Sequence, residues 1–279
     1  MSPALLGLVL LAAVFHAAWN AMLKASEGPM ALAARATAYG TLASFPVVAV
    51  LWFLHGRPGM PGSAWAVVIA SAVLELLYFI ALTNAYQRGE LSVVYPIARG
   101  TAPLLAVAVG LLLLGERVQL PALVGIGCLL AGIWAIRRPT PASAALLPAL
   151  ITGVLIGAYS SVDRVGVRLV APWLYGWLLW FFEAALLLLY TRVRRVAGAN
   201  LRIEPARSLL VGILMTTTYF MILFALSVAP LAIVAPLRES AIVLVTAWGI
   251  WRLRERRGAW LRIGGALIIL VGIGLLTTS

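Results

Sequence analysis

The chain contains the stretch E-L-S-V-V-Y-P-I-A-R-G-T-A-P-L-L-A-V-A-V-G-L-L-L-L-G-E-R at Glu90–Arg117. It repeats the pattern near its C-terminus as P-L-A-I-V-A-P-L-R-E-S-A-I-V-L-V-T-A-W-G-I-W-R-L-R-E-R at Pro230–Arg256. Pro96 aligns with Pro236 at an offset of 140 residues, and the Glu-Arg pair that ends each copy aligns at 139. Each copy predicts an apolar helix with a proline near its start and an acid-base pair at its end. A repeat of about half the chain is typical of internally duplicated membrane proteins.

The composition also indicates a membrane protein. Hydrophobic residues make up 63% of the 279 positions, and the mean hydropathy is +1.04. The net charge is +12, and all but one of the 21 basic residues are arginine. These arginines cluster between the apolar segments, where they set topology against anionic lipid, so we expect no nucleic-acid partner.

Several chemistries have no basis in this sequence. A single cysteine, Cys128, excludes a disulfide within the chain and a cysteine-built metal site. His16 and His55 are the only histidines, which excludes a histidine-rich site. The chain contains no Walker loop, no H-E-x-x-H and no G-x-S-x-G motif. We therefore predict no catalytic residues, no metal and no cofactor, and a protein that is not an enzyme.

Charged and proline/glycine-rich breaks divide the chain into apolar segments. A membrane-spanning helix needs about 20 apolar residues. Ten segments have roughly that length, at 3–23, 31–54, 64–86, 91–114, 119–136, 146–167, 173–191, 208–228, 231–251 and 259–277. The first has no basic region before it, so we predict a retained helix and not a cleaved signal peptide.

A linker, R-R-P-T-P-A-S at 137–143, separates two halves of five spans each, residues 1–138 and 139–279. With an odd number of spans per half, the second half enters the membrane inverted. The sequence therefore predicts an all-α membrane protein of ten transmembrane helices, arranged as two inverted five-helix repeats around a central cavity.

The distribution of basic residues predicts the orientation. If both termini were cytoplasmic, the cytoplasmic loops would hold only Arg57, Arg117 and Arg168, with Arg164 marginal. The opposite side would hold 14 basic residues: Lys24, Arg88, Arg137, Arg138, Arg192, Arg194, Arg195, Arg202, Arg207, Arg252, Arg254, Arg256, Arg257 and Arg262. The positive-inside rule therefore favours both termini outside.

Polar side chains inside the first four spans are costly in hydrocarbon, so each needs a partner or a cavity. In the first span His16, Asn20 and Lys24 recur every four residues on one helical face, with Trp19 beside them. The remaining candidates in these spans are Glu75, Tyr78, Tyr95 and Arg99. Glu75, in mid-span, is the candidate for charge pairing or proton coupling.

In the second half, Arg238 and Glu239 of the ninth span match the position of Arg99, and both copies of the repeat place a proline one turn before. An arginine beside a proline-loosened helix suits bidentate binding of a carboxylate or phosphoryl group. The alternative is a structural ion pair between Glu75 and one of the arginines. Pro96 and Pro236 are the predicted hinges.

The sixth to eighth spans add further polar residues. Tyr159 and Asp163 share one face of the sixth span, and Arg164 lies near its end, where we expect it at the interface. Glu183 has no polar neighbour within one turn, so it must face another helix. Tyr219 follows three threonines in the eighth span and is equally consistent with packing and with binding. Gly153 and Gly157 form a G-x-x-x-G motif that favours close helix contact.

Three motifs resemble drug/metabolite transporters of the EamA type: H-A-A-W-N-A-M-L-K at 16–24, L-L-L-L-G-E-R-V at 111–118 and its echo R-L-R-E-R-R at 252–257. The resemblance extends over the whole chain and includes small-metabolite exporters of the YddG type. It implies alternating access through a cavity lined by the first, third, fourth, sixth, eighth and ninth spans. Relatives are drawn with both termini cytoplasmic, which is opposite to the arginine distribution.

We therefore expect a multi-pass protein of the inner (cytoplasmic) membrane, a monomer or homodimer, that exports a small polar or amphipathic metabolite resembling an amino acid. Aromatic residues beside charges of both signs suit a zwitterion with an apolar side chain. The predicted substrate-binding residues are His16, Trp19, Asn20, Glu75, Tyr78, Tyr95, Arg99, Tyr159, Asp163, Tyr219, Arg238 and Glu239. The alternatives are an uptake permease for an anionic metabolite, such as a phosphonate or sugar phosphate, and a flippase for a lipid-linked headgroup.

Overall fold

A computed structural model describes residues 2–88, 91–137, 146–196, 205–241, 243 and 259–277, and every element in these ranges is a helix. The α-helices are α1 (Pro3–Lys24), α2 (Pro29–Leu54), α3 (Gly62–Arg88), α4 (Leu91–Leu112), α5 (Leu120–Arg137), α6 (Leu146–Leu169), α7 (Pro172–Val193), α8 (Pro205–Val228), α9 (Leu231–Arg238) and α11 (Ala259–Thr277). A 3₁₀ turn, η1 (Glu239–Ala241), follows α9.

Prolines begin several of these helices. A proline at the first helical position loses no hydrogen bond, because the first N–H groups of a helix have no partner within it. Pro3 and Pro205 begin α1 and α8, and Pro121 is the second residue of α5. The Ser2 hydroxyl caps α1 by accepting a hydrogen bond from the backbone N–H of Leu5 at 3.3 Å.

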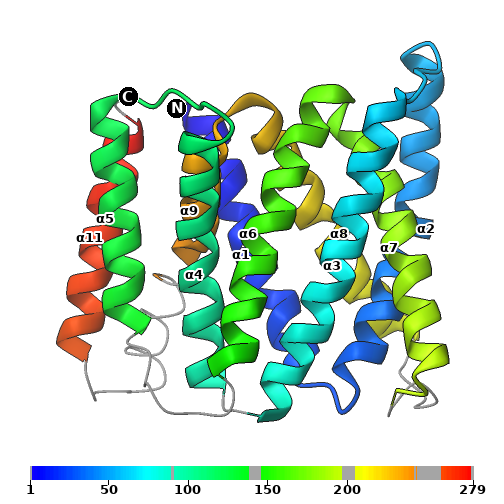
Figure 1. Ribbon diagram of the computed structural model, residues 1–279, viewed down its shortest axis with the longest axis horizontal. Coiled ribbons are helices and arrows are strands. Elements are labelled where there is room, and N and C mark those ends of the chain that lie inside the picture. The colour runs from blue at the N-terminus through cyan, green and yellow to red at the C-terminus, as the bar shows by residue number, and fades with distance from the viewer. Residues whose placement is uncertain are drawn as a thin grey trace.

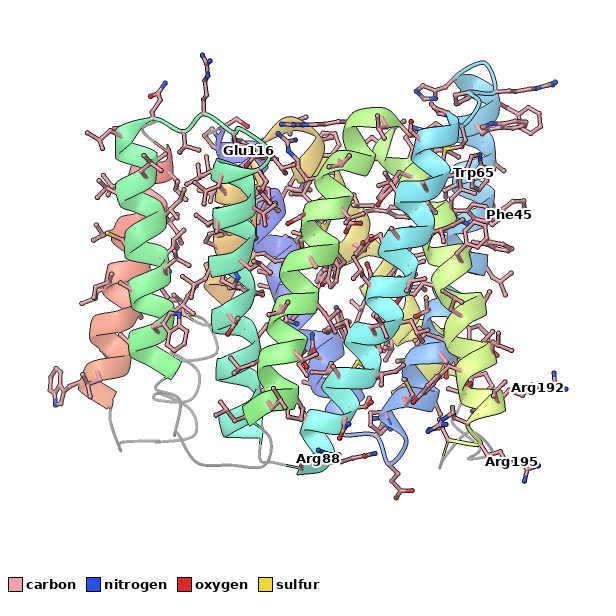
Figure 2. All side chains as sticks on the ribbon, in the orientation of Figure 1. Phe45, Trp65, Arg88, Glu116, Arg192 and Arg195 are labelled. Carbon is pink, nitrogen blue, oxygen red and sulfur yellow. The ribbon has the colours of Figure 1, made fainter. Side chains whose placement is uncertain are left out.

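The helices form a multi-pass membrane protein. Six of the described helices are long and apolar enough to cross a membrane. Large apolar side chains such as Phe45 and Trp65 point outward from the bundle, where lipid would cover them (Figure 2). Nine of the ten predicted spans coincide with a described helix to within a few residues.

The predicted ninth span, 231–251, is described at residues 231–241 and 243, where an α-helix gives way to a 3₁₀ turn before residue 243 is helical again. Pro236 lies inside α9 and has no N–H to donate to the preceding turn. The α-helix ends two residues later at Arg238 and tightens into η1. The predicted hinge at Pro236 therefore lies beside a real break in the helix. The side chains of Pro96 and Tyr95 lie outside the described residues, although both positions belong to helix α4.

The bundle has a defined order of helices (Figure 1). The paired α5 and α11 stand at one side, α2 and α7 at the other, and the remaining helices lie between them, with both termini at one end. Helix α3 packs against α6 and α7, and helix α8 packs against α1 and α2. In each predicted half, the third helix therefore packs against the first two helices of the other half, as expected if the two halves are related. The inverted repeat and the halves 1–138 and 139–279 nevertheless remain predictions.

The close helix contact predicted at Gly153 and Gly157 is present. A Cβ atom at Gly153 would lie 2.7 Å from the carbonyl oxygen of Ala98, and one at Gly157 would lie 2.9 Å from the Cβ of Leu105. Both neighbours belong to α4, so these two glycines allow α6 to approach α4 closely.

A buried ion pair connects the two halves of the sequence at the end of the bundle that carries the termini (Figure 2). Glu116, from the loop after α4, accepts hydrogen bonds from the backbone N–H groups of Leu231 and Ala232 at 2.8 and 3.0 Å. It thereby caps the N-terminus of α9, where a negative charge is stabilised. Nε of Arg164 donates to the same carboxylate at 2.9 Å, and Nη1 of Arg164 donates to the carbonyl oxygen of Leu226.

This contact shows what surrounds Arg164, which the sequence places near the end of its span. Its side chain is buried inside the protein, because Glu116 and the C-terminal end of α8 provide partners for its guanidinium group. We call Glu116, Arg164 and the first turn of α9 the latch. Gly110 leaves room for it, since a Cβ there would lie 2.6 Å from Oε2 of Glu116.

We expect Glu116→Gln to lower the free energy of unfolding by on the order of 3 kcal/mol, because it leaves the Arg164 charge buried without its counter-ion. Thermal unfolding in detergent measures the change. Glu27→Gln, at an exposed glutamate between α1 and α2, is the matched control. Equal melting temperatures for the two variants would contradict the structural importance of the latch.

The positive-inside rule generates a second expectation. Arg88, Arg192 and Arg195 lie at the end opposite the termini (Figure 2), so that end should face the cytoplasm. Alkaline phosphatase fused after Ser279 should be active and a green fluorescent protein fused there should be dark. The reverse pattern would place both termini in the cytoplasm.

Candidate functional site

A small cavity lies in the middle of the bundle, between α1, α3, α6, α7, α8 and α9. Its lining residues are His16, Trp19, Glu75, Tyr78, Phe79, Tyr159, Trp180, Glu183, Met215, Thr218, Tyr219, Ile222 and Arg238. Its volume is about 40 Å³, enough for a few water molecules at most, whereas ligand sites usually measure roughly 300–1,000 Å³. The cavity is thus central, smaller than a usual ligand site, and lined in part by charged side chains.

Three carboxyl groups gather at one wall of the cavity, and Tyr219 links two of them. Its hydroxyl forms hydrogen bonds to Oε1 of Glu75 and to Oδ2 of Asp163. Glu183 of α7 lines the same cavity as Glu75. All three carboxyl groups are at least 95% buried. We call Glu75, Asp163, Glu183 and Tyr219 the acidic cluster.

Asp163 has two further partners behind the cavity wall. The hydroxyl of Ser71 donates to its Oδ1 at 2.6 Å, and the hydroxyl of Tyr175 donates to the same atom at 2.8 Å. These bonds join α3, α6, α7 and α8 around one carboxyl group. Such bonds to a carboxylate favour its ionised form.

The other wall is basic. Nη1 of Arg99 donates to Oε1 of Glu239 at 3.0 Å, and Nη2 of Arg99 donates to Nε2 of His16. Because a guanidinium group can only donate, His16 accepts with Nε2. Nε of Arg238 lies 3.6 Å from the same Glu239 oxygen, within ion-pair range but beyond a hydrogen bond.

Aromatic rings also line the cavity. The rings of Tyr78 and Tyr159 meet edge to face with centroids 5.7 Å apart, and the ring of Trp180 lies 5.8 Å from that of Tyr219. The ring of Trp19 lies 4.6 Å from that of His16, again edge to face. The cavity therefore combines aromatic surface with acidic and basic side chains.

Several buried polar atoms on these walls have no conventional partner in the part of the chain that the structure describes. Nε1 of Trp19, Nε1 of Trp180 and Nε of Arg238 donate no hydrogen bond there. Oε2 of Glu183 accepts none from an N–H, alcohol or phenol group there. All four side chains line the cavity. Unsatisfied buried polar groups are costly, so this cavity combines unused donors with an unused acceptor.

The structure brings most of the predicted residues together. Those lining the cavity are His16, Trp19, Glu75, Tyr78, Tyr159, Tyr219 and Arg238. Asp163, Arg99 and Glu239 lie directly behind them as hydrogen-bond or ion-pair partners. Asn20 does not line the cavity, because its amide donates to the carbonyl oxygen of His16 within α1.

Two points of the sequence analysis differ from the structure. The alternative of an ion pair between Glu75 and an arginine is not found: Glu75 bonds to Tyr219, while Arg99 pairs with Glu239. The seventh span, absent from the lining that the family resemblance implied, supplies Trp180 and Glu183. Glu183 does face another helix, as its isolation in the sequence predicted. No sequence signal identified Trp180 among ten tryptophans.

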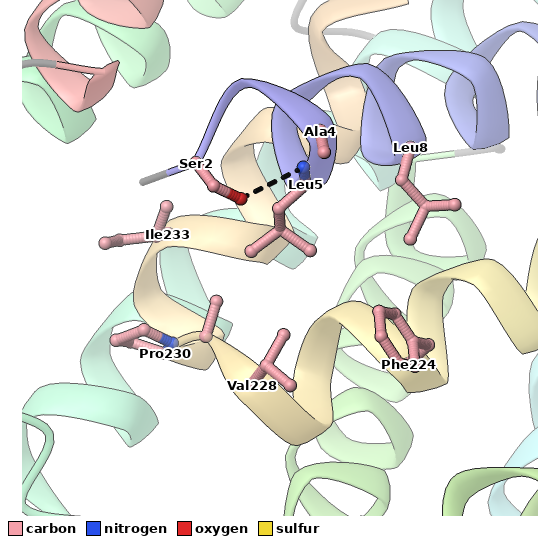
Figure 3. A pocket seen from close by; sticks show the side chains of 9 residues that line it. Ser2, Ala4, Leu5, Leu8, Phe224, Val228, Pro230 and Ile233 are labelled. Atoms are coloured by element: carbon pink, nitrogen blue, oxygen red, sulfur yellow. Dashed lines mark hydrogen bonds between the residues drawn. The ribbon is translucent and has the colours of Figure 1, made fainter.

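A second, larger cavity lies at the end of the bundle that carries the termini (Figure 3). It measures about 670 Å³ and lies between the start of α1 and the turn from α8 to α9. Its lining includes Leu5, Leu8, Phe224 and Val228, and it contains no charged residue. Of these two cavities, only the smaller central one is lined by charged side chains.

Comparison with known proteins agrees with this architecture. Residues 4–138 match the EamA-like transporter family, so the first half of this membrane protein carries an EamA-like domain. A solved structure described as "Crystal structure of protein" has the same fold, with a TM-score of 0.74 and 16% identity. That match covers 99% of this chain and 96% of the other. No curated protein matches the chain.

We expect Tyr219→Phe to destabilise the fold by about 1–2 kcal/mol, because removal of the bridging hydroxyl leaves buried carboxyl oxygens without their partner. Denaturant unfolding in detergent measures this change. Tyr39→Phe, at an exposed tyrosine of α2, is the control. Equal stability of the two variants would show that the Tyr219 bridge contributes nothing.

Proposed function

We propose that this protein is a secondary transporter that exports a small zwitterion with an apolar side chain, resembling an amino acid, by alternating access. One observation carries the proposal: the unpartnered donors of Arg238, Trp19 and Trp180 line the same cavity as the acidic cluster. The EamA-like domain at residues 4–138 supports the transport class.

In the proposed complex the substrate carboxylate binds the guanidinium group of Arg238. Arginine is well suited to this because its planar donors match a carboxylate, and a charge-assisted bond is stronger in a buried site. The indole N–H groups of Trp19 and Trp180 donate to the remaining carboxylate or to other polar atoms of the substrate. The ammonium group lies against Glu75 and Glu183.

The apolar side chain of the substrate then packs between the rings of Tyr78 and Tyr159. A cavity of about 40 Å³ cannot hold a leucine-sized molecule, so binding requires the helices to separate. The break after Pro236 supplies a place for movement beside Arg238. Opening at the end that carries the termini would also have to release the latch, which holds α9 to the loop after α4.

An uptake permease for an anionic metabolite is the first alternative. It needs both arginines at the substrate, yet Arg99 forms an ion pair with Glu239 and a hydrogen bond with His16. It also leaves the three carboxyl groups facing an anion. A flippase for a lipid-linked headgroup needs a polar cavity open to the lipid, whereas the larger cavity is apolar. Both alternatives therefore explain less of the site.

A panel of three ligands tests the proposal: leucine, its analogue without the ammonium group (4-methylpentanoate) and its analogue without the carboxylate (3-methylbutylamine). Binding to the purified protein raises the melting temperature by mass action. We expect leucine to give a larger rise than either analogue at equal concentration, because only leucine engages both ends of the cavity. Tighter binding of methylphosphonate than of leucine would favour the anion permease instead.

We further expect Arg238→Gln to weaken leucine binding by about tenfold or more, the loss of one charged hydrogen bond, and to leave the affinity for 3-methylbutylamine nearly unchanged. Isothermal titration calorimetry measures both constants. Arg192→Gln, at an exposed arginine ending α7, is the matched control. An equal loss for both ligands would mean that Arg238 supports the fold and does not contact the carboxylate.

A further inference from the structure

The hydrogen bonds of the acidic cluster restrict which of its groups carry a proton. The Tyr219 hydroxyl contacts both Oε1 of Glu75 and Oδ2 of Asp163, but it has a single hydrogen to donate. An ionised carboxylate can only accept. One of the two carboxyl groups must therefore supply the hydrogen for its own contact with Tyr219.

The surroundings identify which group is ionised. Asp163 already accepts from Ser71 and Tyr175, and a third bond from Tyr219 completes a shell of donors suited to a carboxylate. Tyr219 thus donates to Asp163 and accepts from Glu75. Glu75 is then the protonated partner in that contact.

Glu183 faces a similar restriction. It is buried and lines the same cavity as Glu75, and its Oε2 has no hydrogen-bond partner in the part of the chain that the structure describes. A buried carboxylate without a partner is costly, so Glu183 is protonated as well. With Asp163 ionised, the three carboxyl groups then carry a single negative charge.

The other titratable and charged groups around the cavity do not satisfy Glu75 or Glu183. They are His16, Tyr78, Arg99, Tyr159, Arg238 and Glu239. Arg99 and His16 bond to each other, and Glu239 lies between the two arginines. Arg238 is the one described cation of the cavity lining, and it lies with the basic wall. A proton is therefore the cation that the two glutamates hold in this conformation.

We propose that Glu75 and Glu183 form a proton site whose proton and the ammonium group of the substrate exclude one another, so that the protein exchanges protons for substrate. This inference rests on the proposed function. When substrate binds from the cytoplasmic side, a glutamate releases its proton to water on that side and the resulting carboxylate binds the ammonium group. When substrate leaves on the other side, the carboxylate takes up a proton from that side, and the protonated site returns.

Proton exchange has a direct thermodynamic signature. Binding that releases roughly one proton makes log Kd fall by about one for each pH unit of increase, so affinity rises with pH. Titration of the wild-type protein with leucine, in two buffers of different ionisation enthalpy, measures the number of protons released per bound molecule. The same titration with 3-methylbutylamine tests whether the ammonium group is responsible.

We expect both ligands to release a proton from the wild-type protein. Glu75→Gln and Glu183→Gln preserve size and hydrogen bonding, and each should reduce the release and flatten the dependence of log Kd on pH. Glu27→Gln, at the exposed glutamate, should behave as the wild type. Two glutamine variants are included so that the conclusion does not depend on the folding of one.

Two outcomes would overturn the inference, and they are distinguishable. Leucine that binds with a pH-independent Kd and no proton release removes the exchange but leaves the proposed substrate class intact. Failure of both leucine and 3-methylbutylamine to bind the folded wild-type protein overturns the proposed function together with the exchange. Unchanged proton release in both glutamine variants assigns the proton to another group and contradicts the site.

Discussion

The central constraint on this molecule is that three carboxyl groups lie together in a membrane-embedded core, where one phenol hydroxyl links two of them. Glu75, Asp163 and Glu183 come from three different helices, and Tyr219 from a fourth joins Glu75 to Asp163. Burial removes these groups from bulk water, so each contact between them needs its own hydrogen. The hydrogen bonds of Tyr219 therefore restrict the protonation of the cluster as well as the packing of the helices around it.

The basic wall differs from the acidic cluster because its charged groups are partnered by ion pairs. Arg99 is held by Glu239 and His16, so its charge is neutralised locally and it orders the junction of α1, α4 and η1. Arg238 keeps a donor that no described residue accepts. The two arginines therefore differ: Arg99 bonds to both Glu239 and His16, whereas Arg238 is within ion-pair range of Glu239 and keeps one unused donor. At the end with the termini, the latch places a third buried ion pair where the loop after α4 meets α9.

Much of this architecture could be predicted from the sequence because hydrocarbon imposes simple rules. Apolar runs of sufficient length predicted nine described helices, and prolines marked several of their starts. Glu75, Asp163 and Tyr219 were predicted as site residues because a polar residue in an apolar run needs a hydrogen-bond or ion-pair partner. What could not be predicted is the rotation of each helix about its axis. That rotation decides that Glu75 meets Tyr219 and not an arginine. It also decides that the amide of Asn20 bonds to the backbone of its own helix and that Arg164 reaches Glu116 across 48 positions of sequence.

The account depends on protonated glutamates that lose a proton when an ammonium group arrives. Difference infrared spectroscopy of the purified protein, with and without leucine, observes this event directly through the C=O stretch of protonated carboxyl groups. The account predicts that leucine removes such a band from the wild-type protein, and that Glu75→Gln or Glu183→Gln diminishes the change. A protein that binds leucine with no change in any protonated-carboxyl band would contradict it.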